Sequence, residues 1–238
     1  MKLTIGHLYP DLLNLYGDRG NITALQIRAE QRGIQADVLP VSLKDDIDFS
    51  SLDIVFIGGG SDREQLLVCN RLRELQTDIA RYVEDNGVLV AVCGGYQLLG
   101  SYYKLKEETI PGLEILDIYT VQENGRLIGN IILESDLINS TIVGFENHGG
   151  RTYIGNHTPL GKVKYGHGNN GKDGLEGVVY KNVIATYLHG PLLPKNPKLT
   201  DRILQNALTR RYGAVSLQPL NDTYEIAAHN YILERFLK

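Results

Sequence analysis

Cys93 is the residue of this chain whose surroundings best suit covalent chemistry. It stands in the string AVCGGYQ, between an apolar segment and a stretch typical of a helix. A sharp strand-to-helix turn lifts a side chain off a sheet, as in the nucleophile elbows of other α/β enzymes. Unpaired N–H groups at the helix start favour a thiolate, and the N–H of Gly94 would face an oxyanion formed when sulfur attacks a carbonyl. The spacing alone leaves open whether Cys93 is a nucleophile or a small buried core residue.

A thiolate nucleophile is usually paired with an imidazole. Of the six histidines, His189 directly follows the apolar segment Val183–Leu188, so we expect it at the same edge of a sheet as Cys93. His148 is the second candidate, with a hydrogen-bonded scaffold role inside a turn as its alternative. Cys69 lies among the leucines of a helical stretch, and we expect it to pack in the core.

A second glycine-rich turn, Gly58-Gly59-Gly60, follows the apolar segment Asp53–Ile57. Ligands of parallel sheets bind beyond the carboxyl ends of the strands. We therefore expect this turn to face the same site as Cys93 and to supply a second oxyanion donor.

The first half of the chain alternates predicted strands with predicted helices. The strands are Lys2–Leu8, Gln35–Val41, Asp53–Ile57 and Val88–Val92, and the helices are Asn21–Arg32 and Arg63–Asn86. Asn21 is the expected N-cap of the first helix. The expected buried stripe of the second helix comprises Leu66, Leu67, Leu72, Leu75, Ile79 and Val83. Strands that are apolar on both faces and separated by helices indicate an α/β fold with a mostly parallel sheet and helices on both faces.

The second half of the chain contains many turn-forming residues and short β-like pieces. Its expected elements are strand pieces at Arg126–Leu133 and Thr141–Phe145, an exposed loop at Gly166–Gly174, a buried strand at Val183–Leu188, and helices at Leu199–Tyr212 and Asp222–Lys238. We find no internal repeat and no long linker, so the simplest organisation is a single domain over residues 1–238.

Composition excludes several classes of protein. The chain has 238 residues, 42% of them hydrophobic, and a net charge of -4, which disfavours disorder and nucleic-acid binding through bulk charge. A polar N-terminus, two cysteines and no long apolar run predict a cytoplasmic protein without a membrane anchor. There is no P-loop and no GxGxxG motif after a strand, so we expect this chain to bind neither ATP nor a metal.

Four blocks, IGGGSDREQ, VCGGYQLLG, GFENHGGRT and TYLHGPLLPKNP, resemble the CobB/CobQ-type class I glutamine amidotransferases. The opening block LYPDLLNLYGDRGN is similar to that of the glutaminase subunits of bacterial lipid II isoglutaminyl synthases. These blocks extend from about Leu8 to Pro197 and therefore cover most of the chain. The resemblance implies a flavodoxin-like class I glutamine amidotransferase fold.

The resemblance also implies roles for individual residues. Cys93 would attack the side-chain amide of L-glutamine, with His189 as the general base and then the general acid. The backbone N–H groups of Gly60 and Gly94 would bind the oxyanion, while Gln97 lies in the stretch that contacts glutamine in relatives.

Arg126 corresponds to the arginine that the family associates with glutamine, and a guanidinium can bind an α-carboxylate with two hydrogen bonds. Without the resemblance, Arg126 would be interpreted as a solvated loop residue. One departure from the wider class concerns His189, which is followed by Gly190-Pro191 instead of the carboxylate of a His-x-Glu motif. We expect the orienting carboxylate to come from the partner subunit, with Glu146 as the alternative within this chain.

The resemblance further implies a heterodimer with a separate Mur-ligase-like subunit, MurT. That subunit would hold ATP and Mg²⁺ and activate the α-carboxyl of D-glutamate in lipid II, and ammonia from this chain would form D-isoglutamine. Two alternatives stay open at this point. The chain is either a glutaminase for another amidation, of the cobyrinic-acid type, or a non-catalytic module that stabilises its partner.

Overall fold

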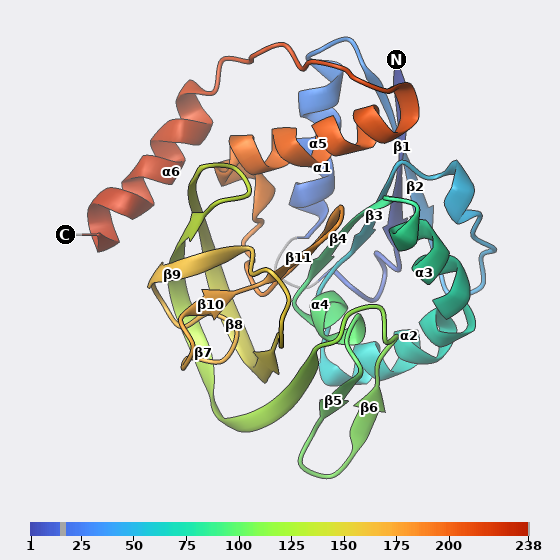
Figure 1. Ribbon diagram of the computed structural model, residues 1–238, viewed down its shortest axis with the longest axis vertical. Coiled ribbons are helices and arrows are strands. Elements are labelled where there is room, and N and C mark those ends of the chain that lie inside the picture. The colour runs from blue at the N-terminus through green and yellow to red at the C-terminus, as the bar shows by residue number, and fades with distance from the viewer. Residues whose placement is uncertain (15–17, 238) are drawn as a thin grey trace.

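The computed structural model describes residues 1–14 and 18–237 (Figure 1). Residues 15–17 of the opening block and Lys238 at the end of the last predicted helix therefore lie outside the described residues.

The main sheet has six strands in the order β11-β12-β4-β3-β1-β2. They are β1 (Lys2–Leu8), β2 (Gln35–Val41), β3 (Ile54–Ile57), β4 (Val88–Val92), β11 (Val178–Tyr180) and β12 (Val183–Thr186). All neighbours are parallel except β11, which runs antiparallel to β12 at the edge. Every residue of β3, β4 and β12 is buried, which explains why these strands are apolar on both faces. The predicted parallel sheet is confirmed.

Helices cover both faces of this sheet (Figure 1). They are α1 (Arg19–Glu30), α2 (Asp62–Glu74), α3 (Gln76–Glu84), α4 (Gly94–Leu98), α5 (Pro197–Tyr212) and α6 (Thr223–Phe236), with short 3-10 turns η2 (Phe49–Ser51) and η3 (Leu193–Lys195). Helices α1 and α5 pack together on one side, and α2 and α3 lie on the other. Helix α6 lies at the periphery beside β8, and none of its residues is buried. Among the described helices, none is both long and apolar enough to span a bilayer.

The single long helix predicted over Arg63–Asn86 is wrong, because the chain turns at Leu75 and forms α2 and α3. At the turn, the side chain of Gln76 donates to the carbonyl of Leu113 at 2.7 Å, which joins the helix pair to a distant loop.

The predicted buried stripe is confirmed at Leu72, Leu75, Ile79 and Val83 and is wrong at its first two positions. Leu66 and Leu67 are 38% and 50% exposed, whereas Val68, Cys69 and Leu72 are buried. The helix therefore turns its Val68–Cys69–Leu72 side to the core, and Cys69 packs there as expected.

Two polar predictions are corrected in the same way. Asn21 is not the N-cap of α1, which begins at Arg19; it is buried, and its side chain accepts the N–H of Leu193 at 2.8 Å. The loop Gly166–Gly174 is exposed only in part, because Asn169 and Asn170 are buried. The Asn169 side-chain oxygen accepts hydrogen bonds from the hydroxyl of Tyr96 and from a backbone N–H, so the loop is tied to α4.

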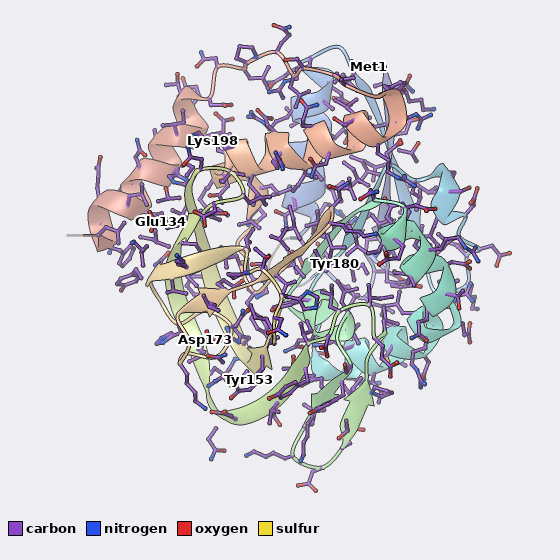
Figure 2. All side chains as sticks on the ribbon, viewed as in Figure 1. Met1, Glu134, Tyr153, Asp173, Tyr180 and Lys198 are labelled. Carbon is purple, nitrogen blue, oxygen red and sulfur yellow. The ribbon has the colours of Figure 1, made fainter. Side chains whose placement is uncertain are left out.

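A second, mostly antiparallel sheet contains the predicted strand pieces Arg126–Leu133 and Thr141–Phe145, each inside a longer strand. It comprises β5 (Tyr102–Lys104), β6 (Thr109–Pro111), β7 (Tyr119–Ser135), β8 (Ser140–Tyr153), β9 (Gly161–Tyr165) and β10 (Leu175–Glu176). Tyr153 and Glu134, both labelled in Figure 2, lie at opposite ends of the β7–β8 ribbon. The ribbon bulges between Gln122 and Leu127, and this bulge carries Arg126. The prediction of one domain over residues 1–238 stays a prediction.

Candidate active site

Cys93 lies in the sharp turn that the sequence predicts. It directly follows β4 and is the N-cap of α4, with φ 52° and ψ −104°, a conformation that is strained for a residue with a side chain. The N–H of Cys93 donates to the carbonyl of Thr186 at 2.8 Å. The N–H of Gly95 donates to the carbonyl of Gly58 at 3.1 Å. A Cβ on Gly95 would lie 2.7 Å from the carbonyl oxygen of Ile57, so only glycine fits there. The neighbouring strands therefore hold the elbow in its strained form.

His189 lies at the same edge of the sheet as Cys93. The parallel register pairs Thr186, the last residue of β12, with Val92, the last residue of β4, so the two strands end at the same level of the sheet. A Cβ atom placed on Gly59 would lie 3.0 Å from Cβ of Cys93 and 3.6 Å from Cε1 of His189. A single methyl group would thus contact both side chains, which brings the two predicted catalytic residues together.

The imidazole of His189 is fully buried. Loss of solvation, together with smaller contributions from the neighbouring His148 and Arg126, lowers its pKa to about 3. At neutral pH the ring is therefore uncharged and able to accept the proton of a thiol.

A pocket of about 260 Å³ opens above the elbow. Its walls contain four of the six predicted site residues, namely Gly60, Cys93, Gln97 and Arg126. The remaining lining residues are Ser61, Gln65, Tyr103, Gln122, Asn147, His148 and Gly149. The sequence blocks that are far apart in the chain therefore meet at one cavity.

Two backbone N–H groups are available at this cavity. The N–H of Gly59 donates to the carboxylate of Asp18 at 2.6 Å, and that of Gly95 is used by Gly58. Among the described residues, no acceptor is recorded for the N–H of Gly60 or of Gly94. These are the two groups predicted to bind an oxyanion, and that role stays a prediction.

Gln65 lies between the two candidate oxyanion donors. It is buried, its side-chain N–H donates to the carbonyl of Gly60 at 3.2 Å, and a Cβ on Gly94 would lie 2.8 Å from the same nitrogen. Gln65 belongs to the block IGGGSDREQ, but the sequence analysis did not single it out. The side chain fixes the spacing between the glycine run and the elbow.

Gln97 is held at the floor of the pocket. Its side-chain N–H donates to the hydroxyl of Tyr187 at 3.0 Å, and that hydroxyl lies 2.6 Å from the hydroxyl of Thr152. Burial raises the pKa of Tyr187 well above its usual value, so its hydroxyl stays protonated. The chain of bonds fixes the amide of Gln97 in one orientation.

Arg126 reaches the pocket from the second sheet. Its guanidinium donates to the side-chain oxygen and to the backbone carbonyl of Asn147, both at 2.8 Å. The arginine is exposed, so it is an anchored residue at the mouth of the pocket. Its part in substrate binding stays a prediction.

His148 has the surroundings of a scaffold residue. Its ring stacks on that of Tyr187 with centroids 3.6 Å apart, and its Nδ1 donates to the carbonyl of Gly150 at 2.7 Å. Glu146, the proposed orienting carboxylate within this chain, accepts the N–H groups of His167 and Gly168. Its carboxylate therefore holds the loop that follows β9.

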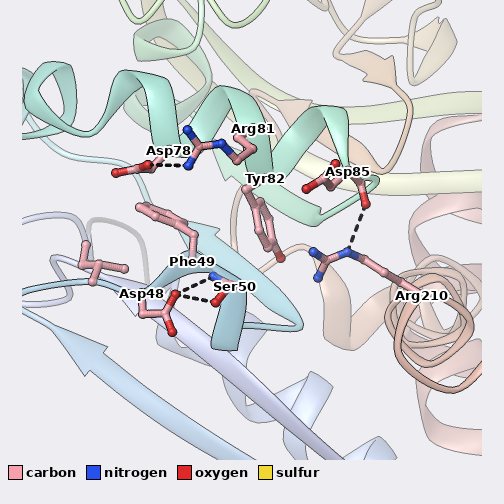
Figure 3. A pocket seen from close by; sticks show the side chains of 9 residues that line it. Asp48, Phe49, Ser50, Asp78, Arg81, Tyr82, Asp85 and Arg210 are labelled. Atoms are coloured by element: carbon pink, nitrogen blue, oxygen red, sulfur yellow. Dashed lines mark hydrogen bonds and ion pairs between the residues drawn. The ribbon is translucent and has the colours of Figure 1, made fainter.

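A larger cavity, of about 330 Å³, lies between η2 and α3 (Figure 3). It opens at the amino ends of β3 and β4, away from Cys93. Its charged groups are paired locally: Asp78 with Arg81 at 3.2 Å, and Arg210 with the carbonyl of Asp85 at 3.1 Å. We therefore assign no chemistry to it. Among the described residues there is no group of three or more potential metal ligands.

Comparison with known proteins adds to this geometry. The CobB/CobQ-like glutamine amidotransferase domain matches residues 4–197. The chain is 46% identical to subunit GatD of the lipid II isoglutaminyl synthase (glutamine-hydrolyzing) of Staphylococcus aureus (strain N315), over 98% of this chain and 96% of that one. It is 45% identical to the subunit of the same name from Streptococcus pneumoniae, over 89% and 83%. A probable cobyric acid synthase of Methanothermobacter thermautotrophicus is 27% identical, over 92% of this chain and 47% of that protein.

Solved structures share the fold. A crystal structure of a glutamine amidotransferase superimposes with a TM-score of 0.58 at 18% identity, covering 85% of this chain and 98% of that one. The glutaminase domain of Trypanosoma brucei CTPS with bound acivicin gives a TM-score of 0.57 at 11% identity, over 91% and 96%. The α/β fold predicted from the sequence is thus that of glutamine amidotransferases. With its elbow, its paired glycine turns and these matches, the chain belongs to the CobB/CobQ-like glutamine amidotransferase family.

Proposed function

We propose that this chain is the glutaminase subunit of a lipid II isoglutaminyl synthase. It hydrolyses L-glutamine to glutamate and ammonia and passes the ammonia to a Mur-ligase-like partner, MurT. The observation that carries the proposal is the pocket whose wall contains both Cys93, in its elbow before α4, and Gly60 of the glycine run. The two relatives named GatD support the choice of acceptor, since the similarity extends over 96% and 83% of their lengths.

The first half of the reaction forms a thioester. His189 takes the proton of the Cys93 thiol, and the sulfur attacks the side-chain carbonyl carbon of glutamine. The N–H groups of Gly60 and Gly94 stabilise the resulting oxyanion. The imidazolium of His189 then protonates the amide nitrogen, the carbon–nitrogen bond breaks and ammonia leaves.

The second half restores the enzyme. His189 accepts a proton from water, which attacks the γ-glutamyl thioester, and the same proton returns to the sulfur as the carbon–sulfur bond breaks. Glutamate is released. A cavity of about 260 Å³ suits a ligand of amino-acid size. Arg126 at its mouth binds the α-carboxylate, and Gln97 at its floor contacts the substrate.

Ammonia must then reach the partner without becoming solvated. In neutral water it is mostly ammonium, which has no lone pair and cannot attack an activated carboxyl. A passage between the two subunits is therefore required, and the partner holds the ATP and Mg²⁺ that activate the α-carboxyl of D-glutamate in lipid II. The product is D-isoglutamine, and the reaction belongs to the cytoplasmic stage of peptidoglycan synthesis.

The test compares the two cysteines of the chain in the complex with its Mur-ligase-like partner. We expect Cys93→Ala to abolish glutamate release from glutamine, whereas Cys69→Ala, in the core of α2, retains it. Unchanged release by Cys93→Ala would overturn the proposal. Co-purification with a corrinoid-pathway enzyme instead of a Mur-ligase-like protein would assign the chain to the cobyrinic-acid type of amidation. Failure of a glutamine-analogue electrophile to label Cys93 would favour a non-catalytic module.

A further inference from the structure

Asp18 is a buried carboxylate directly beneath the glycine run. It lies immediately before α1 and has no exposed surface. Its Oδ2 accepts the N–H of Gly59 at 2.6 Å, whereas its Oδ1 has no hydrogen-bond partner among the described residues. Burying a carboxylate with an unused acceptor costs free energy, so its presence calls for a reason beyond packing.

The Asp18 carboxylate lies near Gly59, as do the side chains of Cys93 and His189. A Cβ on Gly59 would lie 3.6 Å from Oδ2 of Asp18, 3.0 Å from Cβ of Cys93 and 3.6 Å from Cε1 of His189. Cε1 is the ring carbon between the two nitrogens of the imidazole. The side chains of Asp18, Cys93 and His189 thus all lie close to Gly59.

The two buried glutamates nearby bind other groups, although Oε2 of Glu176 has no hydrogen-bond partner among the described residues and Oε2 of Glu146 lies 3.7 Å from Nε2 of His148. Glu146 accepts the N–H groups of His167 and Gly168. Glu176 accepts the hydroxyl of Thr186 and, at 2.8 Å, the N–H of Tyr187. Asp18, by contrast, binds the glycine that lies beside both Cys93 and His189.

We propose that Asp18 is a positioning residue of the Cys93–His189 site, with two effects. Its carboxylate fixes the glycine run that carries the Gly60 oxyanion donor. It also stabilises the imidazolium that forms when His189 takes the thiol proton, as the carboxylate of a His-x-Glu motif does in other members of the wider class. This inference rests on the proposed function.

The charge of Asp18 changes in the neutral range. Burial raises its pKa to about 7, against the opposing effect of the Gly59 N–H. Cys93 faces the carboxylate, and His148 and Arg126 act on the imidazole. Since only the ionised carboxylate stabilises an imidazolium, glutamine hydrolysis should rise with pH through about 7. The pKa of His189 is too low, at about 3, to produce that rise.

The experiment uses the complex with the partner subunit and measures kcat and KM for glutamine hydrolysis across the neutral pH range. We expect Asp18→Asn to lower kcat about 100-fold, with little change in KM, and to remove the rise near neutrality. The matched control is Asp11→Asn, an exposed carboxylate of the same segment, which should retain both kcat and the pH profile.

A folded Asp18→Asn complex with wild-type kcat and an unchanged profile would overturn the inference. If that variant does not fold, Asp18→Glu is measured instead, because it keeps the charge and moves it by one methylene. We then expect a lower kcat with the rise near neutrality retained, and a wild-type complex in which the rise is absent would overturn the inference. A wild-type complex whose Cys93 neither hydrolyses glutamine nor reacts with a glutamine-analogue electrophile would instead overturn the proposed function.

Discussion

Phe145 and His189 exchange two backbone hydrogen bonds, from the N–H of His189 to Phe145 at 2.8 Å and from the N–H of Phe145 to His189 at 3.3 Å. Phe145 lies on β8 of the second sheet, whereas His189 follows β12 of the main sheet. The second sheet therefore fixes the backbone of the proposed general base. Changes in β8 near Phe145, outside the pocket wall, should therefore affect the chemistry.

Gly144 offers a test of this coupling. A Cβ there would lie 2.7 Å from Cγ of Leu188, the residue before His189. Because both backbones are hydrogen-bonded, we expect Gly144→Ala to shift His189 and lower kcat for glutamine hydrolysis about tenfold, with KM nearly unchanged. Thr141→Ala, whose hydroxyl contacts His229 on α6, serves as the control on the same strand. Equal kcat values for the two variants would show that the bridge does not position the base.

Gln65 should affect stabilisation of the oxyanion, and therefore kcat, rather than binding of glutamine. Its side chain holds the carbonyl of Gly60 and contacts Gly94. We expect Gln65→Ala to lower kcat by about 10- to 100-fold, since losing one oriented donor typically costs about 100-fold or more. Gln76→Ala removes a glutamine whose amide binds Leu113 outside the pocket and should leave kcat intact. A rise in KM with unchanged kcat for Gln65→Ala would assign this residue to substrate binding instead.

Substitution of Arg126 should raise KM for glutamine rather than lower kcat. A charge-assisted hydrogen bond contributes about 1.5–3 kcal/mol, so Arg126→Ala should raise KM for glutamine about 10- to 100-fold and change kcat much less. Arg126→Lys should recover only part of this, because an ammonium cannot bind a carboxylate with two parallel hydrogen bonds. Arg81→Ala, an exposed arginine of α3, is the control. An unchanged KM in Arg126→Ala would return this residue to the solvated-loop interpretation.

The sequence predicted the elbow because its signal is local. An apolar strand, a cysteine and two glycines in succession predict the turn at Cys93, and hydrogen bonds to the neighbouring strands hold it. The buried stripe of α2 was misplaced because leucines at Leu66 and Leu67 look like core, and only the packed sheet shows that Val68 and Cys69 face it.

The full length of the second sheet and the contact of Asp18 with Gly59 were missed for a different reason. Long strands such as β7 are only partly buried and carry polar residues and glycines, so their alternation is weak in the sequence. Asp18 approaches Gly59 across a separation of 41 residues. No periodicity or spacing encodes such a contact, although the block LYPDLLNLYGDRGN contains the residue.

Glu176 should make stability depend on pH. It is fully buried, and burial raises its pKa from the usual 4.5 to about 7. The folded state therefore binds a proton that the unfolded state releases between these two values, so its contribution to stability is present below pH 4.5 and is lost as the pH rises to about 7. Glu176→Gln should remove this loss, because the amide is uncharged at every pH and keeps an oxygen for Thr186 and Tyr187. We expect the variant to gain about 1–3 kcal/mol over wild type above neutrality and little at acidic pH.

Urea unfolding at acidic and at slightly alkaline pH measures this difference. Glu134→Gln is the control, because that carboxylate is exposed at the end of β7 and pairs with Lys164 (Figure 2). Some slope will remain in Glu176→Gln, since Asp18 is also buried with a pKa raised to about 7. A Glu176→Gln protein that is less stable than wild type at both pH values would instead mean that the ionised carboxylate is the form that the Thr186 and Tyr187 donors stabilise.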